Sequence, residues 1–138
     1  MKPTTIAVIG SGYWGRNLVR NFGQLGALGW VCDAHLEVAR AHAEMWEGAR
    51  HTSSFDEILE DVETPAVAIA SPARLHFEHA KAALESNKHV FVEKPLALNL
   101  SEGEKLVALA EEKNRVLMVG HILRYHPAVI KLRELIES

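Results

Sequence analysis

Three glycines near the start of the chain have the spacing of loops that bind the phosphates of nucleotides. Gly10, Gly12 and Gly15 form the pattern G-x-G-x-x-G, directly after the apolar run Ile6–Ile9 and at the start of a predicted helix. The first glycine permits a tight turn, the second lets the backbone approach a pyrophosphate, and the third lets the helix pack closely on a sheet. Because a helix start also offers free N–H groups to an anion, we predict a dinucleotide-binding loop. The alternative is an ordinary tight turn between a strand and a helix.

One acidic residue stands where such a loop needs a partner for the adenine ribose. Asp33 lies 18 residues after Gly15, at the end of the second predicted strand, close to the spacing expected for the acid that binds the ribose hydroxyls. Its carboxylate should repel the extra phosphate of NADP, although His35 and Arg40 nearby weaken that preference. We therefore predict NAD as the cofactor, with NADP less favoured. The alternative is that Asp33 only caps the following helix.

The elements that must position these residues follow from the hydropathy pattern. Short apolar runs alternate with segments of helical spacing through the whole chain, which predicts an α/β fold with a doubly wound parallel sheet (Rossmann), in a single domain. The predicted strands are 6–9, 28–32, 66–70, 89–92 and 116–119, and the predicted helices are 13–25, 36–46, 54–59, 75–86, 101–113 and 127–137.

Polar residues at the predicted helix starts support these boundaries. The patterns Ser54-x-x-Glu57 and Ser101-x-x-Glu104 are those of capping boxes, and Pro127 suits the first turn of the last helix.

Composition excludes several classes of protein. The 138 residues suffice for one domain, and 48% hydrophobic with 24% charged residues is typical of a globular protein. A net charge of −3 argues against nucleic acid as the main partner. The single cysteine, Cys32, lies in an apolar run and is expected to be a buried filler, in keeping with a reducing compartment. No apolar stretch approaches the ~20 residues of a membrane span, so we expect a cytoplasmic protein.

Two later segments narrow the assignment. Ser71-Pro72-Ala73-Arg74-Leu75-His76 and the run from His89 to Glu93-Lys94-Pro95 resemble the glucose-fructose oxidoreductase / inositol dehydrogenase (Gfo/Idh/MocA) family, of which the Glu-Lys-Pro triplet is the best-known mark. The segments 12–15 and 124–127 look most like members that act on UDP-amino sugars or their acids as 3-dehydrogenases. The resemblance runs from the glycine loop to the end of the chain and implies the family's N-terminal Rossmann domain.

The resemblance also implies roles for single residues. Lys94 matches the family lysine beside the nicotinamide and the reacting sugar carbon, where an ammonium could hydrogen-bond a substrate hydroxyl. Glu93 would orient Lys94 or contact the nicotinamide. Apart from the resemblance, His121 and His126 lie in a short loop and have the chemistry of general bases, and His121 is the second candidate for a catalytic role. The other residues expected to bind the cofactor are Tyr13, Trp14, Ser71, Pro72, His76, Arg124 and Tyr125.

Each of these residues also has a purely structural interpretation. Lys94 would be an ordinary solvated lysine if the triplet were absent. His76 and His79 have a spacing found in metal sites, but no cysteine or acid cluster accompanies them, so packed or surface histidines are favoured and no metal is predicted.

The resemblance implies that a part of the enzyme lies outside this chain. Family members carry a second α+β domain that supplies most of the sugar pocket, so we expect a Rossmann domain over 1–126 and a terminal helix over 127–138 that begins or links to that domain. The apolar stripe of this helix, formed by Val129, Leu132, Leu135 and Ile136, either folds back on the sheet or drives homo-oligomerisation or pairing with a second domain or chain.

The predicted function follows from the motif and the resemblance together. We expect the NAD-binding domain of an oxidoreductase that transfers hydride between a nicotinamide cofactor and a sugar, a sugar nucleotide or a cyclic polyol, hence an NAD(P)-dependent dehydrogenase. The alternatives are a non-catalytic dinucleotide-binding module or one subunit of a split dehydrogenase. A Rossmann-like domain for another ligand, such as coenzyme A, is disfavoured by Asp33 and the Glu-Lys-Pro triplet.

Overall fold

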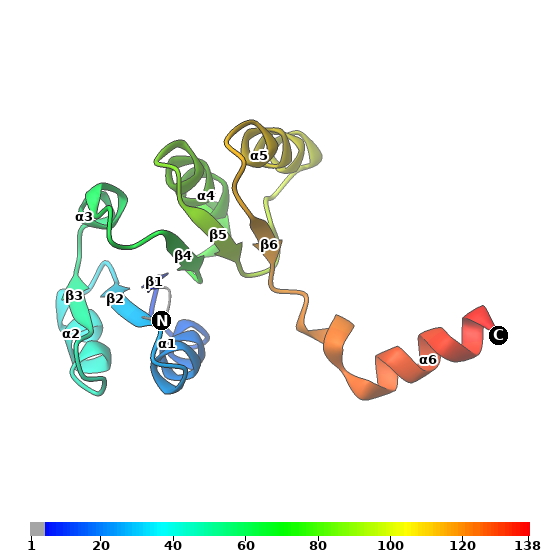
Figure 1. The fold of residues 1–138 in the computed structure, drawn as a ribbon, viewed down its shortest axis with the longest axis horizontal. Helices are drawn as coiled ribbons and strands as arrows, with labels where there is room; N and C mark the ends of the chain where they lie inside the picture. Colours follow the sequence, from blue (N-terminus) through cyan, green and yellow to red (C-terminus); the bar gives the residue numbers. More distant parts are fainter. Residues whose placement is uncertain (1–4) are drawn as a thin grey trace.

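Six parallel strands form one sheet in the order β3-β2-β1-β4-β5-β6 (Figure 1). The structure is a computed structural model that describes residues 5–138, so residues 1–4 of the expected domain lie outside the described part. The predicted doubly wound α/β fold is confirmed. The strands are β1 (Ile6–Ile9), β2 (Leu28–Cys32), β3 (Arg50–Thr52), β4 (Ala66–Ile69), β5 (His89–Val92) and β6 (Leu117–Val119).

Helices cover both faces of the sheet. On one face α1 and α2 pack through Val19, Ala39 and Ala43 against β1 and β2, and on the other face α3, α4 and α5 bury apolar side chains against the sheet (Figure 1). The helices are α1 (Gly15–Gln24), α2 (Leu36–Ala43), α3 (Phe55–Glu60), α4 (His76–Glu85), α5 (Leu100–Glu112) and α6 (Pro127–Glu137), with short 3₁₀ turns η1 (Ala73–Leu75) and η2 (Ile122–Tyr125). None of the described helices is long and apolar enough to cross a bilayer.

The strand order reverses between β1 and β4. Both strands are apolar on both faces, with Ala7, Val8, Val67 and Ala68 fully buried or nearly so, as expected for central parallel strands. The chain winds from β1 towards β3 and then returns to β4. At the carboxyl edge of the sheet, the loop after β1 therefore leads to a helix on one face, and the loop after β4 leads to a helix on the other face. Such a switch point opens the crevice in which α/β sheets bind ligands.

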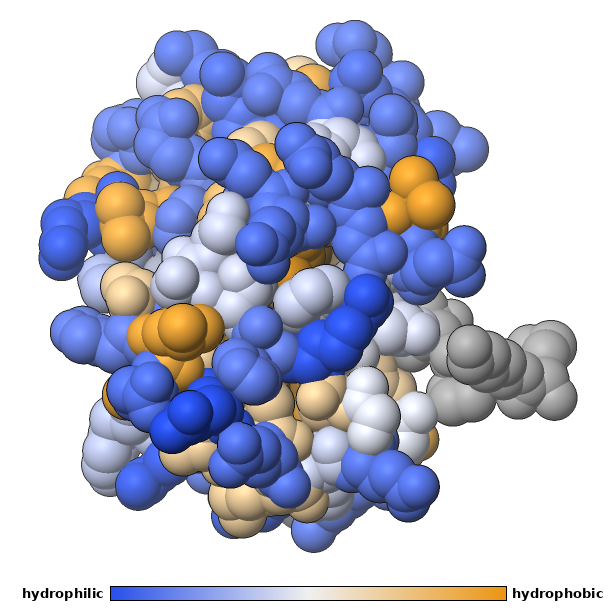
Figure 2. Space-filling model, turned by 90° about the vertical axis from the view of Figure 1, so that its left-hand side faces the viewer, coloured by the Kyte–Doolittle hydropathy of each residue, from blue (hydrophilic) through white to orange (hydrophobic). Residues whose placement is uncertain are grey.

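Strand β3 was not predicted. It comprises Arg50, His51 and Thr52 and pairs with β2 at the edge of the sheet. Three polar residues give no apolar run, and an edge strand needs little burial, so the pairing is visible only in three dimensions. The side of the molecule that includes this edge is mostly hydrophilic, with apolar side chains in separate small groups (Figure 2).

The two predicted capping boxes are wrong in detail. Ser54 occupies the N-cap of α3, but its side chain makes no capping hydrogen bond. Helix α5 begins earlier than predicted, and its cap is Asn99, whose side-chain oxygen accepts from the Glu102 backbone N–H at 2.9 Å. Asparagine is as good a cap as serine, and Asn99 lies two residues before the predicted Ser101.

The last helix, α6, extends away from the sheet (Figure 1). Pro127 lies in its first turn, as predicted, and the His126 imidazole accepts a hydrogen bond from the Ala128 N–H at 3.2 Å. Its apolar side chains, including Leu132, Leu135 and Ile136, are exposed. The expected stripe therefore does not fold back on the sheet of this chain.

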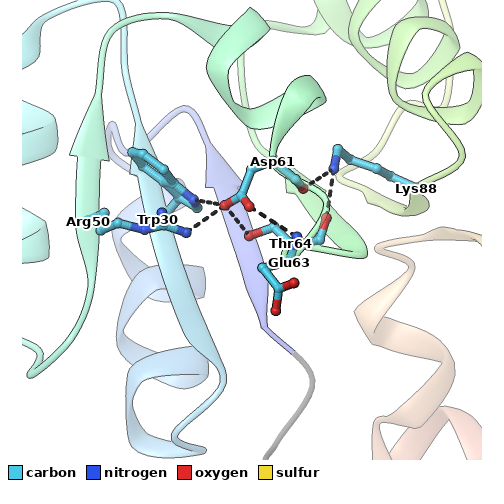
Figure 3. A network of polar contacts seen from close by, with 6 residues as sticks. All are labelled: Trp30, Arg50, Asp61, Glu63, Thr64 and Lys88. Carbon is cyan, nitrogen blue, oxygen red and sulfur yellow. Dashed lines mark hydrogen bonds and ion pairs between the residues drawn. The ribbon is translucent and has the colours of Figure 1, made fainter.

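A network of polar contacts joins the segment between α3 and β4 to its neighbours (Figure 3). The Asp61 carboxylate accepts hydrogen bonds from Trp30 Nε1 at 2.6 Å and from Thr64 Oγ1 at 3.0 Å, and it pairs with Arg50. The buried Lys88 ammonium donates to the carbonyl oxygens of Asp61 and Thr64. Burial lowers the pKa of Lys88, and the nearby Asp61 carboxylate opposes that effect. These contacts fix the amino-terminal ends of β4 and β5.

Replacing Asp61 with alanine should destabilise the fold without touching the carboxyl edge. The loss of the hydrogen bonds from Trp30 and Thr64 leaves two donors without a strong acceptor, which we expect to reduce the free energy of unfolding by about 2–3 kcal/mol. Urea unfolding followed by circular dichroism measures the change. The matched control is Glu63→Ala, because Glu63 is exposed and contributes only its backbone N–H to the network; equal stability of the two variants would contradict the prediction.

Candidate cofactor-binding site

The glycine loop has the backbone geometry that its pattern predicts. Gly10 has φ +86°, and a Cβ there would lie 2.7 Å from the Ser71 backbone nitrogen. A Cβ on Gly15 would lie 1.9 Å from the Gly10 carbonyl oxygen, whereas a Cβ on Gly12 would have no atom within 4 Å. Gly10 and Gly15 are thus required by packing inside the protein. Packing within the chain places no such demand on Gly12, as expected of a position kept clear for a ligand.

The start of α1 offers unpaired donors to a ligand. Helix α1 begins at Gly15, and within residues 5–138 the backbone N–H groups of Gly12, Tyr13 and Trp14 have no recorded acceptor in the protein. Free N–H groups at the positive end of a helix bind anions, phosphates in particular. The Tyr13 side chain is 82% exposed. The Arg16 guanidinium lies over the Tyr13 ring, with Arg16 Cζ 5.0 Å from the ring centre.

Asp33 is bonded to the glycine loop itself. One carboxylate oxygen accepts from the Ser11 backbone N–H at 2.8 Å and from Ser11 Oγ at 3.1 Å, and the other accepts from the His35 N–H at 3.0 Å. Burial alone would raise the pKa of Asp33, but these hydrogen bonds lower it below its usual value. His35, not Asp33, is the N-cap of α2, and its side chain makes no capping bond. The helix-capping alternative for Asp33 is therefore not what its contacts support.

A cavity of about 630 Å³ opens at the other end of the glycine loop. It lies where the loops after β4, β5 and β6 meet Trp14, and it brings together seven of the predicted residues. The lining residues are Trp14, Ala70, Ser71, Ala73, His76, Glu93, Lys94, Gly120, His121, Ile122, Leu123, Arg124 and Val129. Lys94, His121 and Arg124 contribute exposed polar side chains to a wall that is otherwise largely apolar, an arrangement common in ligand sites.

Glu93 lines this cavity and connects it to the glycine loop through Trp14. Its carboxylate, in a residue only 7% exposed, accepts a 2.6 Å hydrogen bond from Trp14 Nε1. A Cβ on Gly120 would lie 3.0 Å from this carboxyl group. A side chain at the exit of β6 would therefore require the Glu93 carboxyl group to shift by a few tenths of an ångström.

Two histidines of α4 hold the loop after β4. His76 is buried, with Nδ1 2.6 Å from the Pro95 carbonyl oxygen and Nε2 2.8 Å from the Ser71 carbonyl oxygen. His79 lies one turn later, with Nδ1 2.9 Å from Ser71 Oγ and its ring tilted against Phe55. Burial lowers the pKa of His79, and the neighbouring His76 lowers it further. Within residues 5–138 no group of three His, Cys, Asp or Glu side chains is arranged to hold a metal ion.

Some predicted residues lie outside the cavity. Asp33 is at the opposite end of the glycine loop, Pro72 is the residue before η1, and Tyr125 is exposed on η2. Sequence reasoning missed Ser11 and Gly120. Ser11 occupies a position at which the glycine pattern accepts any residue, and Gly120 could have been noticed because it directly follows a predicted strand.

A known family matches most of the chain. The family described as “Oxidoreductase family, NAD-binding Rossmann fold” matches residues 4–121. The chain belongs to this family. The resemblance to Gfo/Idh/MocA proteins expected from the Glu-Lys-Pro triplet is thereby confirmed, and the chain is an NAD-binding Rossmann domain of the family.

Similar proteins of the family act on sugars and sugar nucleotides. UDP-N-acetylglucosamine 3-dehydrogenase of Acidithiobacillus ferrooxidans is 36% identical over 128 residues, which are 92% of this chain and 40% of the relative. Levoglucosan dehydrogenase of Pseudarthrobacter phenanthrenivorans is 30% identical over 148 positions, covering 100% of this chain and 38% of the relative. This chain of the Gfo/Idh/MocA family thus spans about two fifths of the length of these relatives.

Solved structures of the family have the same fold and contain nicotinamide cofactors. GenD2 from gentamicin A biosynthesis, in complex with NAD, has a TM-score of 0.91 and 31% identity over 98% of this chain and 39% of its own. KijD10, a 3-ketoreductase from Actinomadura kijaniata in complex with NADP and TDP-benzene, has a TM-score of 0.89 and 25% identity over 98% of this chain and 42% of its own. Both forms of the cofactor therefore occur in structures similar to this domain.

The contacts of Asp33 make stability depend on pH in a defined direction. Because the pKa of Asp33 is lower in the folded protein than its usual 3.8, the unfolded chain binds the proton more readily. The stabilisation is complete above the unfolded pKa and is lost as the pH falls through the folded pKa. Asp33→Asn should therefore be less stable than the wild type at neutral pH and should lose less stability between about pH 5 and pH 2.

Urea unfolding at a series of pH values measures this difference. The control is Glu47→Gln, because Glu47 is exposed in a loop and makes no hydrogen bond or ion pair with any residue in 5–138. If the free energy of unfolding of Asp33→Asn falls with decreasing pH as steeply as that of the wild type, the Ser11 and His35 contacts do not stabilise the carboxylate.

Proposed function

We propose that this chain is the cofactor-binding domain of a dehydrogenase that acts on a sugar, a sugar nucleotide or a cyclic polyol. The observation that carries the proposal is the continuity between the glycine loop, with its open Gly12 and unpaired N–H groups, and the cavity that contains Lys94. The substrate class is supported by the sugar and sugar-nucleotide enzymes among the relatives, which include a UDP-N-acetylglucosamine 3-dehydrogenase.

The residues present fit a dinucleotide laid along the carboxyl edge of the sheet. The N–H groups of residues 12–14 would bind the pyrophosphate, Asp33 would face the adenine ribose, and Trp14, Ser71 and Glu93 would surround the nicotinamide end. When bound, the nicotinamide supplies the chemistry of hydride transfer. The near absence of solvent at Ser11 and His76, which are 0% and 2% exposed, supports a preformed wall on the protein side.

Lys94 and His121 are the candidates for proton chemistry at the substrate. Both line the cavity. The Lys94 ammonium would donate a hydrogen bond to the substrate oxygen at which charge changes, and the His121 imidazole could exchange a proton there. Arg124, on the same wall, would bind an anionic part of the substrate, such as a carboxylate or a phosphate. Glu93, already bonded to Trp14, would position this wall rather than take a proton.

We propose NAD as the preferred cofactor. Asp33 presents a partly buried carboxylate that is 13% exposed, and the side chain with the opposite effect, Arg40, forms ion pairs with Glu37 at 2.6 Å and Glu44 at 3.8 Å. The extra phosphate of NADP would meet the charge of Asp33 without a free arginine to offset it. His35 lies 3.5 Å from Asp33 and would favour NADP only when protonated.

The exposed apolar side chains of α6 support pairing with a second domain or a second chain. Contiguous exposed apolar residues on a helix are typical of interaction surfaces. We accordingly propose that residues 5–126 act as the dinucleotide-binding unit and that α6 contributes to an interface.

Titration of the purified chain with NADH and NADPH tests cofactor binding and its selectivity. We expect NADH to bind at least about tenfold more tightly than NADPH, which corresponds to a difference of ~1.4 kcal/mol in binding free energy. Gly12→Ala should abolish most of this binding while leaving the urea midpoint unchanged, because the added Cβ meets nothing within the protein.

The matched control is Gly103→Ala. A Cβ there meets only Leu96 Cδ2 at 3.8 Å, an ordinary contact, and Gly103 lies in α5, outside the cavity wall. Wild-type NADH affinity in Gly12→Ala, or tighter binding of NADPH to the wild type, would contradict the proposal.

A second prediction concerns turnover. Because the similar enzymes are more than twice as long as this chain, we expect the purified chain to bind NADH but to oxidise UDP-amino sugars or their acids slowly or not at all. Absorbance of NADH with these substrates measures the rate. Steady NADH production by the chain alone would show that residues 1–138 contain a complete active site.

A further inference from the structure

We propose that His76 is a positioning residue that holds two loops of the cavity together with a doubly protonated ring. The two loops are those after β4, at Ser71, and after β5, at Pro95, which follows Lys94. The inference depends on the proposed function only for its effect on cofactor binding, since the state of the ring is a property of the protein alone.

The geometry requires two donors on one imidazole. Nδ1 lies 2.6 Å from the Pro95 carbonyl oxygen and Nε2 lies 2.8 Å from the Ser71 carbonyl oxygen. A carbonyl oxygen can only accept, and a neutral imidazole has one donor and one acceptor nitrogen. In either neutral tautomer a lone pair would therefore face an oxygen lone pair at hydrogen-bond distance, and one of the two contacts would open. Both contacts hold together only when both nitrogens carry protons.

Burial leaves the ring no other partner. His76 is 2% exposed, so water cannot satisfy a nitrogen that loses its carbonyl, and a buried unpaired polar group is destabilising. The neighbouring histidine behaves differently. Within residues 5–138 the His79 ring makes one hydrogen-bond contact, with the Ser71 hydroxyl. Because a hydroxyl can either donate or accept, a neutral His79 satisfies this contact.

The charges around His76 act in both directions. The first turn of α4, where His76 lies, is the positive end of a helix and opposes a cation. On α4, Glu78 favours a cation, and burial lowers the pKa of His79, which disfavours a second cation there. Among the groups lining the same cavity, the buried Glu93 carboxylate favours a cation and Lys94 opposes it. The third titratable side chain of this wall near the substrate end, His121, belongs to the loop after β6. His76 is the first residue of α4 and feels this helix effect fully, but two hydrogen bonds donated by a charged ring contribute more than one helix terminus does.

The consequence for the site is a link between its two walls. The Ser71 backbone nitrogen lies against Gly10 of the glycine loop, and the Pro95 carbonyl belongs to the residue directly after Lys94. His76 therefore fixes the separation of the wall that would bind the cofactor from the lysine that would meet the substrate. An error of about 1 Å in such a separation is enough to reduce catalysis about a hundredfold.

Nitrogen-15 NMR of the histidine side chains in the full 138-residue chain tests the ring state without any ligand. At neutral pH we expect both His76 nitrogens to have shifts and N–H couplings of protonated nitrogens. His79 serves as the internal reference and should show one protonated and one unprotonated nitrogen. A His76 ring with one unprotonated nitrogen at neutral pH would overturn the proposal.

Cofactor titration of a matched pair of variants tests the consequence. Asparagine in His76→Asn is shorter than the ring and carries both of its N–H donors on one nitrogen, so it cannot span the two carbonyl oxygens. One loop is released, and NADH affinity should fall about tenfold or more. His79→Asn, one turn along the same helix, keeps a partner for the Ser71 hydroxyl and should change affinity less than about threefold. Equal affinities of the two variants would overturn the positioning role.

Failure of this inference and failure of the proposed function give different results. If the wild type does not bind NADH, the proposed function is wrong, and the NMR result still decides the state of His76. If His76→Asn does not fold, shown by circular dichroism, the NMR measurement on the wild type again decides.

Discussion

The close approach of the glycine loop to the exit of β4 is the contact on which the rest of the site depends. Gly10 lies so near Ser71 that a single added carbon would lie 2.7 Å from its backbone nitrogen, and Gly15 lies even nearer to Gly10. These contacts are made possible by the reversal of strand order between β1 and β4, which places two loop exits side by side without a crossover between them. A larger residue at either position would displace the start of α1, and with it the unpaired N–H groups.

Polar contacts then connect this centre to both ends of the crevice. Towards β2, Ser11 binds the Asp33 carboxylate. Towards β5, Trp14 binds Glu93, and His76 connects the loops after β4 and β5. Loops lack the repeating hydrogen bonds of helices and strands, so their positions are fixed by such individual contacts. The loops are accordingly held by hydrogen bonds where a cofactor would lie, while the polar groups that would meet a substrate, Lys94 and Arg124, are exposed.

Stability and ligand binding are separated along the strands. The network of Asp61 and Lys88 holds the amino-terminal ends of β4 and β5, whereas the glycine loop and the cavity lie at the carboxyl ends. Changes in the first region are expected to act on the fold alone. Helix α6 contributes only Val129 to the cavity wall, and it otherwise extends away from the sheet and leaves its apolar residues exposed.

The sequence by itself determined the fold class, the glycine loop, five of the six strands and the family, because each depends on local patterns: apolar runs such as Ile6–Ile9, the G-x-G-x-x-G spacing and the Glu-Lys-Pro triplet. It missed the edge strand β3, whose residues Arg50 to Thr52 have no apolar signal, and it placed the cap of α5 at the wrong residue. Only the tertiary structure decided which predicted residues meet. Trp14 and Glu93 are 79 positions apart, and the partners of His76 are backbone carbonyls, which no side-chain pattern can reveal. Contacts between distant loops depend on the winding order of the strands, and local sequence does not encode that order.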